Sequence, residues 1–458
     1  MGGRDKPRGK ILPIVFIDNE NYLMYHFIMN ENYWKSRWSK NQIKAMLLEQ
    51  FDSFWKRDTG IPRDRLVEVE KAAGLPHAVI LSGLRRVGKS TLLAQMAHRL
   101  GQDAFYYLNF EDDRFLGFQA EDANDLYQSL VELFGERKVF VVDEVQNVTG
   151  WEHFVRRFME MEFKFYITGS NASLLSQELG SRLTGRYVPI ELFPFSFHEF
   201  LEFRGLPIPN LQRMTTANKG LLKSALDAYI QMGGIPDALK YPELPLLRTL
   251  YDDVLYRDIA TRYHLDAVTT LKELAFFLMS NPANLVSFNK LKIQFRLGSV
   301  NTIKSYIEHM ENSWLMFTLN QYDFSVKRQQ IAPKKIYSID SGLSNAVGFG
   351  FSSKTGKLLE NLVFLAIRQQ STKEIYYYTT PGGFEVDFYL PEKQQLVQVT
   401  QNLDNPATRA RELRALADAV QSIKVKSALI LSDANEDGFE VNGVPVEVCS
   451  TAEWLLSR

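Results

Sequence analysis

The sequence predicts an α/β fold in which a parallel sheet, covered by helices on both faces, is followed by a mostly helical region and then by a second, smaller α/β region. From residue 77 onward, short apolar runs such as KVFVVDEV and FKFYITGSN alternate with longer helical stretches. Continuous apolar strands joined by helices are typical of parallel sheets buried on both faces. Helical patterns dominate from about residue 197 to 345, and the strands EIYYYTT, FEVDFYL, QLVQVT and SALILS follow.

Composition indicates a soluble globular chain with several domains. The 458 residues are 45% hydrophobic, which suffices for packed cores, and the formal net charge is -1. That charge excludes an overall basic character, so any contact with nucleic acid must come from local patches. The single cysteine, Cys449, excludes an internal disulfide framework. No apolar run reaches the length of a membrane span, and we expect a cytoplasmic protein without a membrane partner.

Residues 1–60 precede the predicted sheet and are rich in aromatic side chains. Within QIKAMLLEQFDSFW, apolar residues recur at helical spacing, namely Ile43, Met46, Leu47, Phe51 and Phe54. This spacing predicts an amphipathic helix. We therefore expect residues 1–60 to form an amino-terminal helical extension.

The stretch VILSGLRRVGKSTLL contains the pattern G-x-x-x-x-G-K-[S/T] between an apolar strand and an apolar helix. Glycines allow main-chain amides to approach phosphate oxygens, and the start of the following helix directs its dipole at the anion. The lysine supplies a charge to the β- and γ-phosphates and the serine a hydroxyl to magnesium. We expect ATP and Mg²⁺ as cofactors, held by Gly83, Arg86, Val87, Gly88, Lys89, Ser90 and Thr91. The alternative is an ordinary glycine turn between a strand and a helix.

Polar residues end two later strands of the predicted sheet. Asp143 and Glu144 follow KVFVV, and Ser170 and Asn171 follow KFYITG. Ligands bind at the carboxyl ends of strands in open α/β sheets, so Asp143 is suited to hold Mg²⁺ and Glu144 to polarise the attacking water. Ser170 or Asn171 would orient that water or sense the γ-phosphate. Solvated turn residues and a helix cap are the structural alternatives.

Two arginines, Arg182 and Arg186, lie in GSRLTGRYVPIEL, on the loop that leads into the last predicted strand of the first sheet. A cation there would reach the transferred phosphoryl group of a neighbouring subunit. The alternative role for either arginine is that of an exposed, solubilising side chain.

Taken in order, these motifs resemble the AAA+ superfamily of P-loop ATPases. More narrowly, the chain resembles a prokaryotic family that joins an AAA+ module to a winged helix and a carboxyl-terminal domain like the restriction-endonuclease fold. The matching segments span residues 61 to about 415, and they are GLRRVGKSTLL, VVDEVQNV, ITGSNASLL, LTGRYVPIELFPFSFHEF, GGIPDAL, LYRDIATRY, KKIYSIDSGL, LLENLVF and EVDFYL.

The resemblance implies an AAA+ ATPase domain over residues 61–205, a helical lid and winged helix over 206–345, and a restriction-endonuclease-like domain over 346–458. It carries the phosphate, metal, water-activating and sensor roles onto the residues already named. It also favours Arg186, in LTGR, as an arginine finger acting in trans, which requires a homo-oligomer. Arg257 and Arg262 of LYRDIATRY receive no role.

The winged helix would comprise the helices SFNKLKIQF and SVNTIKSYIEHMENSWL and the basic stretch SVKRQQIAPKK. Ser299 would cap the longer helix. This helix has an apolar stripe on one face and polar residues on the other. The stripe is Ile303, Ile307, Met310 and Trp314, and the outer residues are Asn301, Lys304, Ser305 and Glu308. The basic stretch would form a wing that places Lys327, Arg328, Lys334 and Lys335 against duplex DNA phosphates. Docking to protein or to another subunit is the alternative, because the exposed face has little charge.

The carboxyl-terminal domain retains only part of a nuclease motif. Metal-dependent nucleases of this fold need two or three carboxylates and a lysine. Asp387 in EVDF and Glu360 in LLENLVF are candidate ligands, but the strand LVQVTQ places Gln398 and Thr400 where an acidic residue and the lysine should be. We therefore expect the fold to persist as a scaffold without efficient cleavage. The arginines of the helix TRARELRAL (Arg409, Arg411 and Arg414) would contact a partner or a nucleic-acid backbone, or form a solvated face.

Three functional hypotheses follow from these observations. The first is a Mg²⁺-dependent ATPase that repositions the winged-helix and nuclease-like modules on a partner, with duplex DNA as one candidate. The second is a slow nucleotide-gated switch or protein-interaction scaffold with little turnover. The third, a small-molecule kinase, is disfavoured because Glu144 beside Asp143 suits activation of water.

Overall fold

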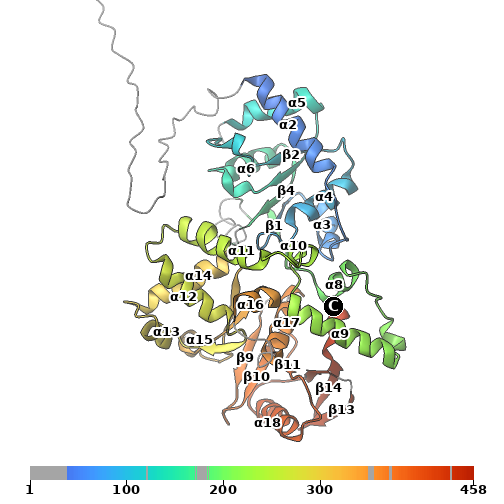
Figure 1. The fold of residues 1–458 in the computed structure, drawn as a ribbon, viewed down its shortest axis with the longest axis vertical. Coiled ribbons are helices and arrows are strands. Elements are labelled where there is room, and N and C mark those ends of the chain that lie inside the picture. The colour runs from blue at the N-terminus through green and yellow to red at the C-terminus, as the bar shows by residue number, and fades with distance from the viewer. Residues whose placement is uncertain are drawn as a thin grey trace, which may run out of the picture.

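The computed structural model describes residues 39–119, 122–170, 172, 183, 185–348, 355–370, 374–433 and 436–457. Figure 1 shows three parts stacked along the long axis: an α/β sheet domain at the top, a helical layer in the middle and a second sheet domain at the bottom. Across the described residues, we find no helix with both the length and the apolar content needed to cross a bilayer.

The first sheet has five parallel strands in the order β2-β3-β4-β1-β5. Their bounds are β1 Ala78–Ser82, β2 Phe105–Asn109, β3 Val139–Asp143, β4 Lys164–Gly169 and β5 Tyr187–Glu191. Alternate residues of β1 pack into different hydrophobic cores, with Val79 and Leu81 in one and Ala78 and Ile80 in the other. The prediction of a parallel sheet buried on both faces is confirmed.

The helices of this domain are α2 Lys40–Trp55, α3 Leu66–Ala73, α4 Lys89–Leu100, α5 Ala123–Phe134 and α6 Trp151–Glu160, with short 3₁₀ turns at Asp113–Phe115 and Val145–Asn147. The predicted amphipathic helix is α2, and its apolar face packs on β2. The Phe54 ring stacks on Tyr107 with 3.8 Å between ring centroids, and the Phe51 and Phe105 rings lie 5.5 Å apart. Helix α2 therefore packs as part of the sheet domain.

The middle layer contains the helices α8 Phe197–Phe203, α9 Thr216–Met232, α10 Pro236–Lys240, α11 Leu246–Asp253, α12 Val268–Met279, α13 Phe288–Gln294, α14 Val300–Asn312, α15 Val326–Ile331 and α16 Ser341–Val347. A 3₁₀ turn at Leu211–Arg213 precedes α9, and a π-helix, Val254–Thr261, follows α11 directly. A small antiparallel sheet has the order β6-β8-β7, with β6 Asn284–Val286, β7 Met316–Leu319 and β8 Lys334–Ser338.

Helix α14 agrees with the sequence pattern. The Ser299 hydroxyl accepts a hydrogen bond from the Thr302 amide at 3.2 Å and caps the helix. The expected apolar stripe is buried and the expected outer residues are exposed. The helix ends at Asn312, so Trp314 follows it, with a positive φ of 60°.

The predicted basic wing does not form as expected. Residues 326–331 are the helix α15, and Lys334 and Lys335 begin the buried strand β8. Lys334 is 8% exposed and Lys335 is 0% exposed, so both side chains are largely buried. The assignment of these two lysines to phosphate contacts is therefore wrong.

The bottom part contains a mixed six-stranded sheet in the order β13-β14-β12-β11-β10-β9. Its strands are β9 Tyr376–Thr379, β10 Glu385–Leu390, β11 Gln395–Val399, β12 Ser427–Ser432, β13 Glu436–Val441 and β14 Val444–Ser450, and its helices are α17 Thr355–Gln369, α18 Pro406–Ser422 and α19 Thr451–Leu456. The sequence predicted β9 to β12 and α18 but not the hairpin β13-β14. Helix α19 returns the chain to α8 and α9 in the middle layer (Figure 1).

Candidate functional site

The glycine-rich loop lies at the carboxyl end of β1, between the neighbouring strands β4 and β5, and leads directly into α4. A Cβ atom on Gly83 would lie 2.2 Å from the carbonyl oxygen of Leu192, so close backbone packing requires glycine there. Gly88 has a φ of +93° and caps α4. The first turn of α4 therefore presents its free N–H groups at the edge where the parallel strands end.

The other predicted loop residues lie around this turn. Val87 is fully buried, whereas Arg86 has a positive φ of 63° and extends toward the middle layer. Its Nη1 atom lies 3.6 Å from Oδ2 of Asp237. Thr91 is a half-buried residue in the first turn of α4.

Lys89 is buried beneath the loop. Its Nζ donates hydrogen bonds to the carbonyl oxygens of Gly83 and Leu84, each at 3.1 Å, and lies 3.8 Å from Oε1 of Glu144. Burial lowers the pKa of Lys89, and the negative charge of Glu144 opposes that shift. The structure therefore places the lysine between the loop and the acidic pair that the sequence singled out.

Asp143 is the last residue of β3 and is 3% exposed. Its carboxylate accepts hydrogen bonds from the hydroxyls of Ser90 and Thr168, and the Tyr107 hydroxyl lies 3.5 Å from Oδ2. Burial raises the pKa of Asp143, and the hydrogen bonds from Ser90 and Thr168 lower it. A serine hydroxyl beside a carboxylate offers the hard oxygen ligands that Mg²⁺ prefers, so these residues fit the predicted metal.

Glu144 follows Asp143 with a φ of 53°, a left-handed conformation that is uncommon outside glycine and clusters at functional sites. Its amide donates to the Thr168 hydroxyl at 3.0 Å, which fixes the turn. The Gln146 side-chain amide donates to the Glu144 carboxylate and, at 3.4 Å, to the Ser170 hydroxyl. Ser170 is 2% exposed, and Gln146 links its hydroxyl to the Glu144 carboxylate.

Two residues at this site were missed from the sequence. Thr168 joins the Asp143 side chain to the Glu144 backbone. Arg63 lies under the loop, 4% exposed, and its guanidinium donates to Oε1 of Glu199 at 2.8 Å, to the carbonyl oxygen of Val87 at 2.6 Å and to that of Phe193 at 2.8 Å. Thr168 could have been noticed as a polar residue in an apolar strand, whereas nothing local in the sequence marks Arg63.

Contacts also join the loop to the middle layer. The Arg85 guanidinium makes a bidentate ion pair with Asp258 in the π-helix, at 2.6 Å and 2.9 Å, and Asp258 is 2% exposed. The indole N–H of Trp314 donates to the hydroxyl of Ser82, the last residue of β1, at 3.0 Å. The loop therefore has a direct polar connection to the part of the chain that follows the sheet.

The arginine-finger candidate lies at the other end of the sheet. Arg186 is exposed and precedes β5, and its carbonyl oxygen accepts a hydrogen bond from the amide of Ala78, the first residue of β1. The glycine-rich loop follows the last residue of the same strand, so Arg186 and the loop lie at opposite ends of β1. Asn171 and Arg182 lie outside the described residues.

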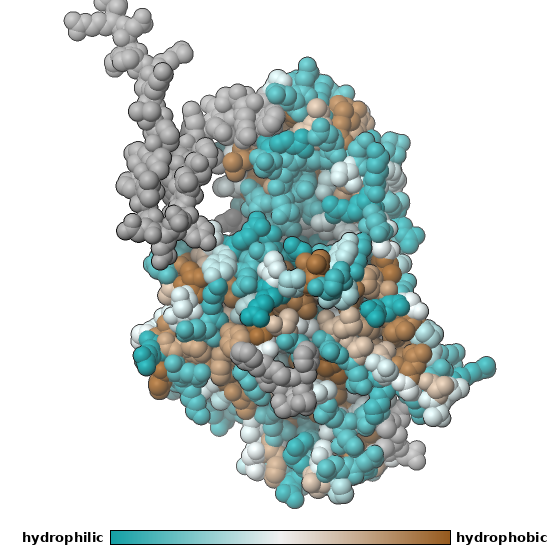
Figure 2. Space-filling view, in the orientation of Figure 1, coloured by the Kyte–Doolittle hydropathy of each residue, from teal (hydrophilic) through white to brown (hydrophobic). Residues whose placement is uncertain are grey.

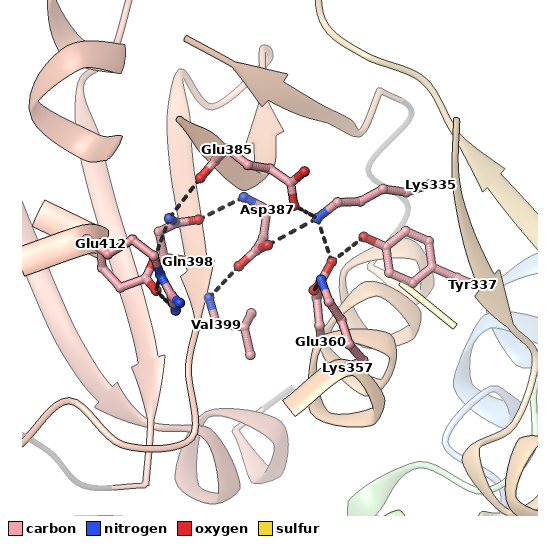
Figure 3. A network of polar contacts seen from close by, with 10 residues as sticks. Lys335, Tyr337, Lys357, Glu360, Glu385, Asp387, Gln398, Val399 and Glu412 are labelled. Carbon is pink, nitrogen blue, oxygen red and sulfur yellow. Dashed lines mark hydrogen bonds and ion pairs between the residues drawn. The ribbon is translucent and has the colours of Figure 1, made fainter. Parts of the chain in front are cut away.

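A second polar cluster lies between the middle layer and the bottom sheet (Figure 3). Glu360 on α17 and Asp387 on β10 approach each other around the Nζ of Lys335, at 2.7 Å and 3.1 Å. Gln398 accepts a hydrogen bond from the Asp387 amide at 2.8 Å, and Thr400 lines the same pocket. Lys335, from a strand of the sheet β6-β8-β7, thus places an ammonium beside both carboxylates, whereas position 400 holds a threonine.

Comparison with known protein families identifies two regions. Residues 76–201 match the AAA domain family, which covers the five-stranded sheet and its glycine-rich loop. Residues 223–355 match a domain of unknown function. Solved structures with partial similarity include the Aeropyrum pernix ORC1 protein in complex with DNA (13% identity, TM-score 0.27, covering 64% of this chain and 95% of that chain). Another is the Thermotoga maritima RuvB Holliday junction branch migration motor (16% identity, TM-score 0.28, covering 61% and 89%).

Two relatives match most of the chain. The uncharacterised protein MJ1544 of Methanocaldococcus jannaschii is 32% identical over 403 residues, which are 84% of this chain and 89% of the relative. An uncharacterised protein of Haemophilus influenzae is 29% identical over 398 residues, or 82% and 94% of the two chains. The chain therefore belongs to the same protein family as MJ1544, and its first sheet is an AAA domain.

Proposed function

We propose that this protein is a Mg²⁺-dependent ATPase of the AAA+ class that couples ATP binding and hydrolysis to movement of its later domains. One observation carries the proposal: Lys89, Ser90, Asp143 and Glu144 converge at the edge of the sheet where the glycine-rich loop meets α4. This arrangement combines an ammonium, hard oxygen ligands and free helix N–H groups, which are the parts that bind and hydrolyse a nucleoside triphosphate.

Each residue has a role that follows from its position. The amides of the loop and Lys89 bind the phosphates, and Ser90 and Asp143 hold the metal. When bound, Mg²⁺ supplies positive charge that neutralises the β- and γ-phosphate oxygens. Glu144 accepts a proton from the attacking water. The Thr168 hydroxyl bonds both the Asp143 carboxylate and the Glu144 amide, so Thr168 is a positioning residue that orients the acidic pair.

We expect Glu144→Gln to lower ATP turnover by about 10²-fold or more while ATP remains bound. An amide cannot accept the proton of the attacking water, and general bases of this kind contribute about 10²- to 10⁴-fold. The phosphate and metal ligands are unchanged, so binding should persist. The measurement pairs phosphate release with retention of radiolabelled ATP after gel filtration.

Glu160→Gln is the matched control, because Glu160 lies on the exposed face of α6 in a solvent-exposed pair with Arg156. It should keep wild-type turnover. Equal turnover by Glu144→Gln and the wild type would contradict the base assignment. A wild-type rate that stays negligible across protein concentration, with and without duplex DNA, would favour the slow-switch alternative.

Arg186 supports an oligomeric form of this function. It is exposed and lies at the edge of the sheet opposite its own phosphate loop, so it cannot serve the site of its own chain. We propose that it reaches the site of a neighbouring subunit, where a guanidinium stabilises charge on the transferred phosphoryl group. The functional unit is then a homo-oligomer.

The Arg85–Asp258 pair is the proposed link between nucleotide binding and the later domains. We expect ATP binding to slow amide exchange in both α4 and the π-helix of the wild type, and Asp258→Asn to retain the effect in α4 but lose it in the π-helix. The reason is that the loop and the π-helix share this bidentate contact, in which Asp258 is buried. Hydrogen exchange read by mass spectrometry, with and without ATP, measures both segments at once.

Asp237→Asn provides the control, because Asp237 approaches Arg86 from α10 at 3.6 Å and is about half exposed. It should leave the response of the π-helix close to that of the wild type. An unchanged response in Asp258→Asn would show that the domains communicate by another route.

The surface of the middle layer supports a protein partner better than a DNA partner. Lys334 and Lys335 are buried, so they cannot contribute to a basic DNA-binding wing. Beside them the chain exposes the apolar side chains Phe324, Val326 and Ile331, which are 78%, 67% and 75% exposed. In Figure 2, hydrophobic residues gather over the middle of the molecule, whereas the upper domain is mainly hydrophilic. Exposed apolar patches rimmed by polar residues are typical of protein interaction sites.

A further inference from the structure

Three carboxylates of the bottom domain surround one ammonium from the middle layer (Figure 3). The Nζ atom of Lys335 lies 2.7 Å from Oε1 of Glu360, 2.8 Å from Oε1 of Glu385 and 3.1 Å from Oδ1 of Asp387. Lys335 is 0% exposed and belongs to β8, whereas Glu360 lies on α17 and Asp387 on β10. A buried charge is tolerated when it is paired and hydrogen-bonded, and this ammonium is paired three times.

The remaining oxygens of Glu360 and Asp387 have donors of their own. Oε1 of Glu360 also accepts from the Tyr337 hydroxyl at 2.8 Å, and Oε2 accepts from Lys357 at 3.0 Å. Oδ2 of Asp387 accepts from the amide of Val399 at 2.9 Å. Both carboxylates are therefore satisfied by the chain itself, and a divalent cation would have to displace protein donors to bind them.

Gln398 closes the same pocket from β11. Its Oε1 accepts from the Asp387 amide at 2.8 Å, and its Nε2 donates to the carbonyl oxygen of Glu385 at 3.2 Å and to Oε2 of Glu412 at 2.6 Å. An amide in this position cross-links the neighbours and adds no negative charge. Within the part of the chain that the structure describes, no group of three or more His, Cys, Asp or Glu side chains is arranged to hold a metal ion.

The charge state of the cluster agrees with its geometry. Burial lowers the pKa of Lys335, but the acidic neighbours Tyr337, Glu360 and Asp387 more than reverse this and hold that pKa well above its usual value. Lys335 is therefore positively charged across the neutral range. A divalent cation that shared its carboxylates would be repelled by this charge at close range.

Further contacts around the lysine join strand β8 to helix α17. The Tyr337 ring stacks on the Phe364 ring of α17, with centroids 4.1 Å apart and planes at 9°. The Asn361 side chain accepts from the Ser338 amide at 2.7 Å and donates to the Ser338 carbonyl at 2.9 Å. Strand β8 and helix α17 are thus held by a polar pair, a ring stack and the Lys335 cluster together.

We propose that Lys335 is a built-in cation that takes the place of a divalent metal in the carboxyl-terminal domain and fastens that domain to the sheet β6-β8-β7. This inference is independent of ATP hydrolysis. It implies that the nuclease-like pocket does not bind a divalent metal and that the two sheets move as one body.

The test measures Mn²⁺ binding without nucleotide, by electron paramagnetic resonance of the free ion. The wild type and Asp387→Asn should bind the same amount of Mn²⁺, because the Lys335 ammonium already occupies the position between the carboxylates of Asp387 and Glu360. Lys335→Ala should bind one additional Mn²⁺ per chain, and Asp387→Asn in that background should remove it. Mn²⁺ should also raise the Tm of Lys335→Ala by more than it raises the wild-type Tm.

Lys334→Ala is the matched control, because the neighbouring ammonium donates only to the carbonyl oxygen of Gln329 among the contacts the structure gives it. It should gain no Mn²⁺. A folded Lys335→Ala that binds no additional ion would overturn the proposal. If Lys335→Ala does not fold, the comparison of the wild type with Asp387→Asn decides: wild-type Mn²⁺ binding that Asp387→Asn removes overturns the inference, and equal binding supports it.

Discussion

Lys89→Ala is expected to weaken ATP binding by about 10²-fold or more and to abolish measurable turnover, while the nucleotide-free protein remains folded. A charged hydrogen bond contributes about 1.5–3 kcal/mol, so losing one that reaches two phosphate groups accounts for this loss of affinity. Without nucleotide, the buried ammonium contacts two loop carbonyls and lies 3.8 Å from Glu144. Its burial is costly, so its removal should change stability little. Fluorescent-nucleotide titration and thermal unfolding measure the two effects separately.

The pH dependence of binding provides a second check on Lys89. Burial lowers the pKa of this side chain in the free protein, and bound phosphate would raise it again. ATP affinity should therefore fall as the pH rises through that lowered pKa, and Lys89→Ala should lack this component. Lys89→Arg should bind poorly as well, because a guanidinium does not fit between the carbonyls of Gly83 and Leu84. Wild-type affinity in Lys89→Ala would remove the basis of the proposed function.

The parts of the site that the sequence predicted are those encoded by local patterns. The glycine-rich loop is contiguous, so its strand, turn and helix are visible together, and Asp143 and Glu144 directly end an apolar strand. The carboxyl ends of parallel strands meet at one edge of a sheet, so the closeness of Ser90 to Asp143 follows from the strand assignment. The apolar stripe of α14 was also predicted from a local pattern, because the spacing of its apolar residues follows from the period of the helix itself.

The parts that the sequence did not predict depend on contacts between distant segments. Arg63 binds Glu199 and the loop carbonyl of Val87, and neither partner is signalled by the residues around it. Lys335 looked like part of a basic, solvent-facing run, yet three carboxylates from later in the chain neutralise it. A local charge pattern predicts exposure only when no distant counter-charge folds onto it, and that information is not local.

Arg63→Met should produce the largest loss of stability among these variants, about 3–5 kcal/mol, because it removes one partner of a buried ion pair and leaves the other uncompensated. Glu199 is 2% exposed and would retain only backbone donors, and the carbonyls of Val87 and Phe193 would lose theirs. The expected fall in Tm is about 10 °C. Thermal unfolding followed by circular dichroism in the ATPase-inactive background Glu144→Gln, with and without ATP, measures it.

The effect should extend to nucleotide binding, because the Arg63 guanidinium fixes the carbonyl that immediately precedes Gly88. Without this hydrogen bond the loop samples conformations that cannot bind phosphate, and the apparent affinity for ATP falls in proportion to the fraction of molecules whose loop can bind.

Arg156→Met is the matched control, since the Arg156 pair is about half exposed and should contribute less than about 1 kcal/mol. Arg63→Met combined with Glu199→Met should recover part of the lost stability, because paired replacement of a buried ion pair by apolar residues is often close to neutral. A loss below about 1 kcal/mol in Arg63→Met alone would show that the loop is held by its own packing and that this buried pair is dispensable.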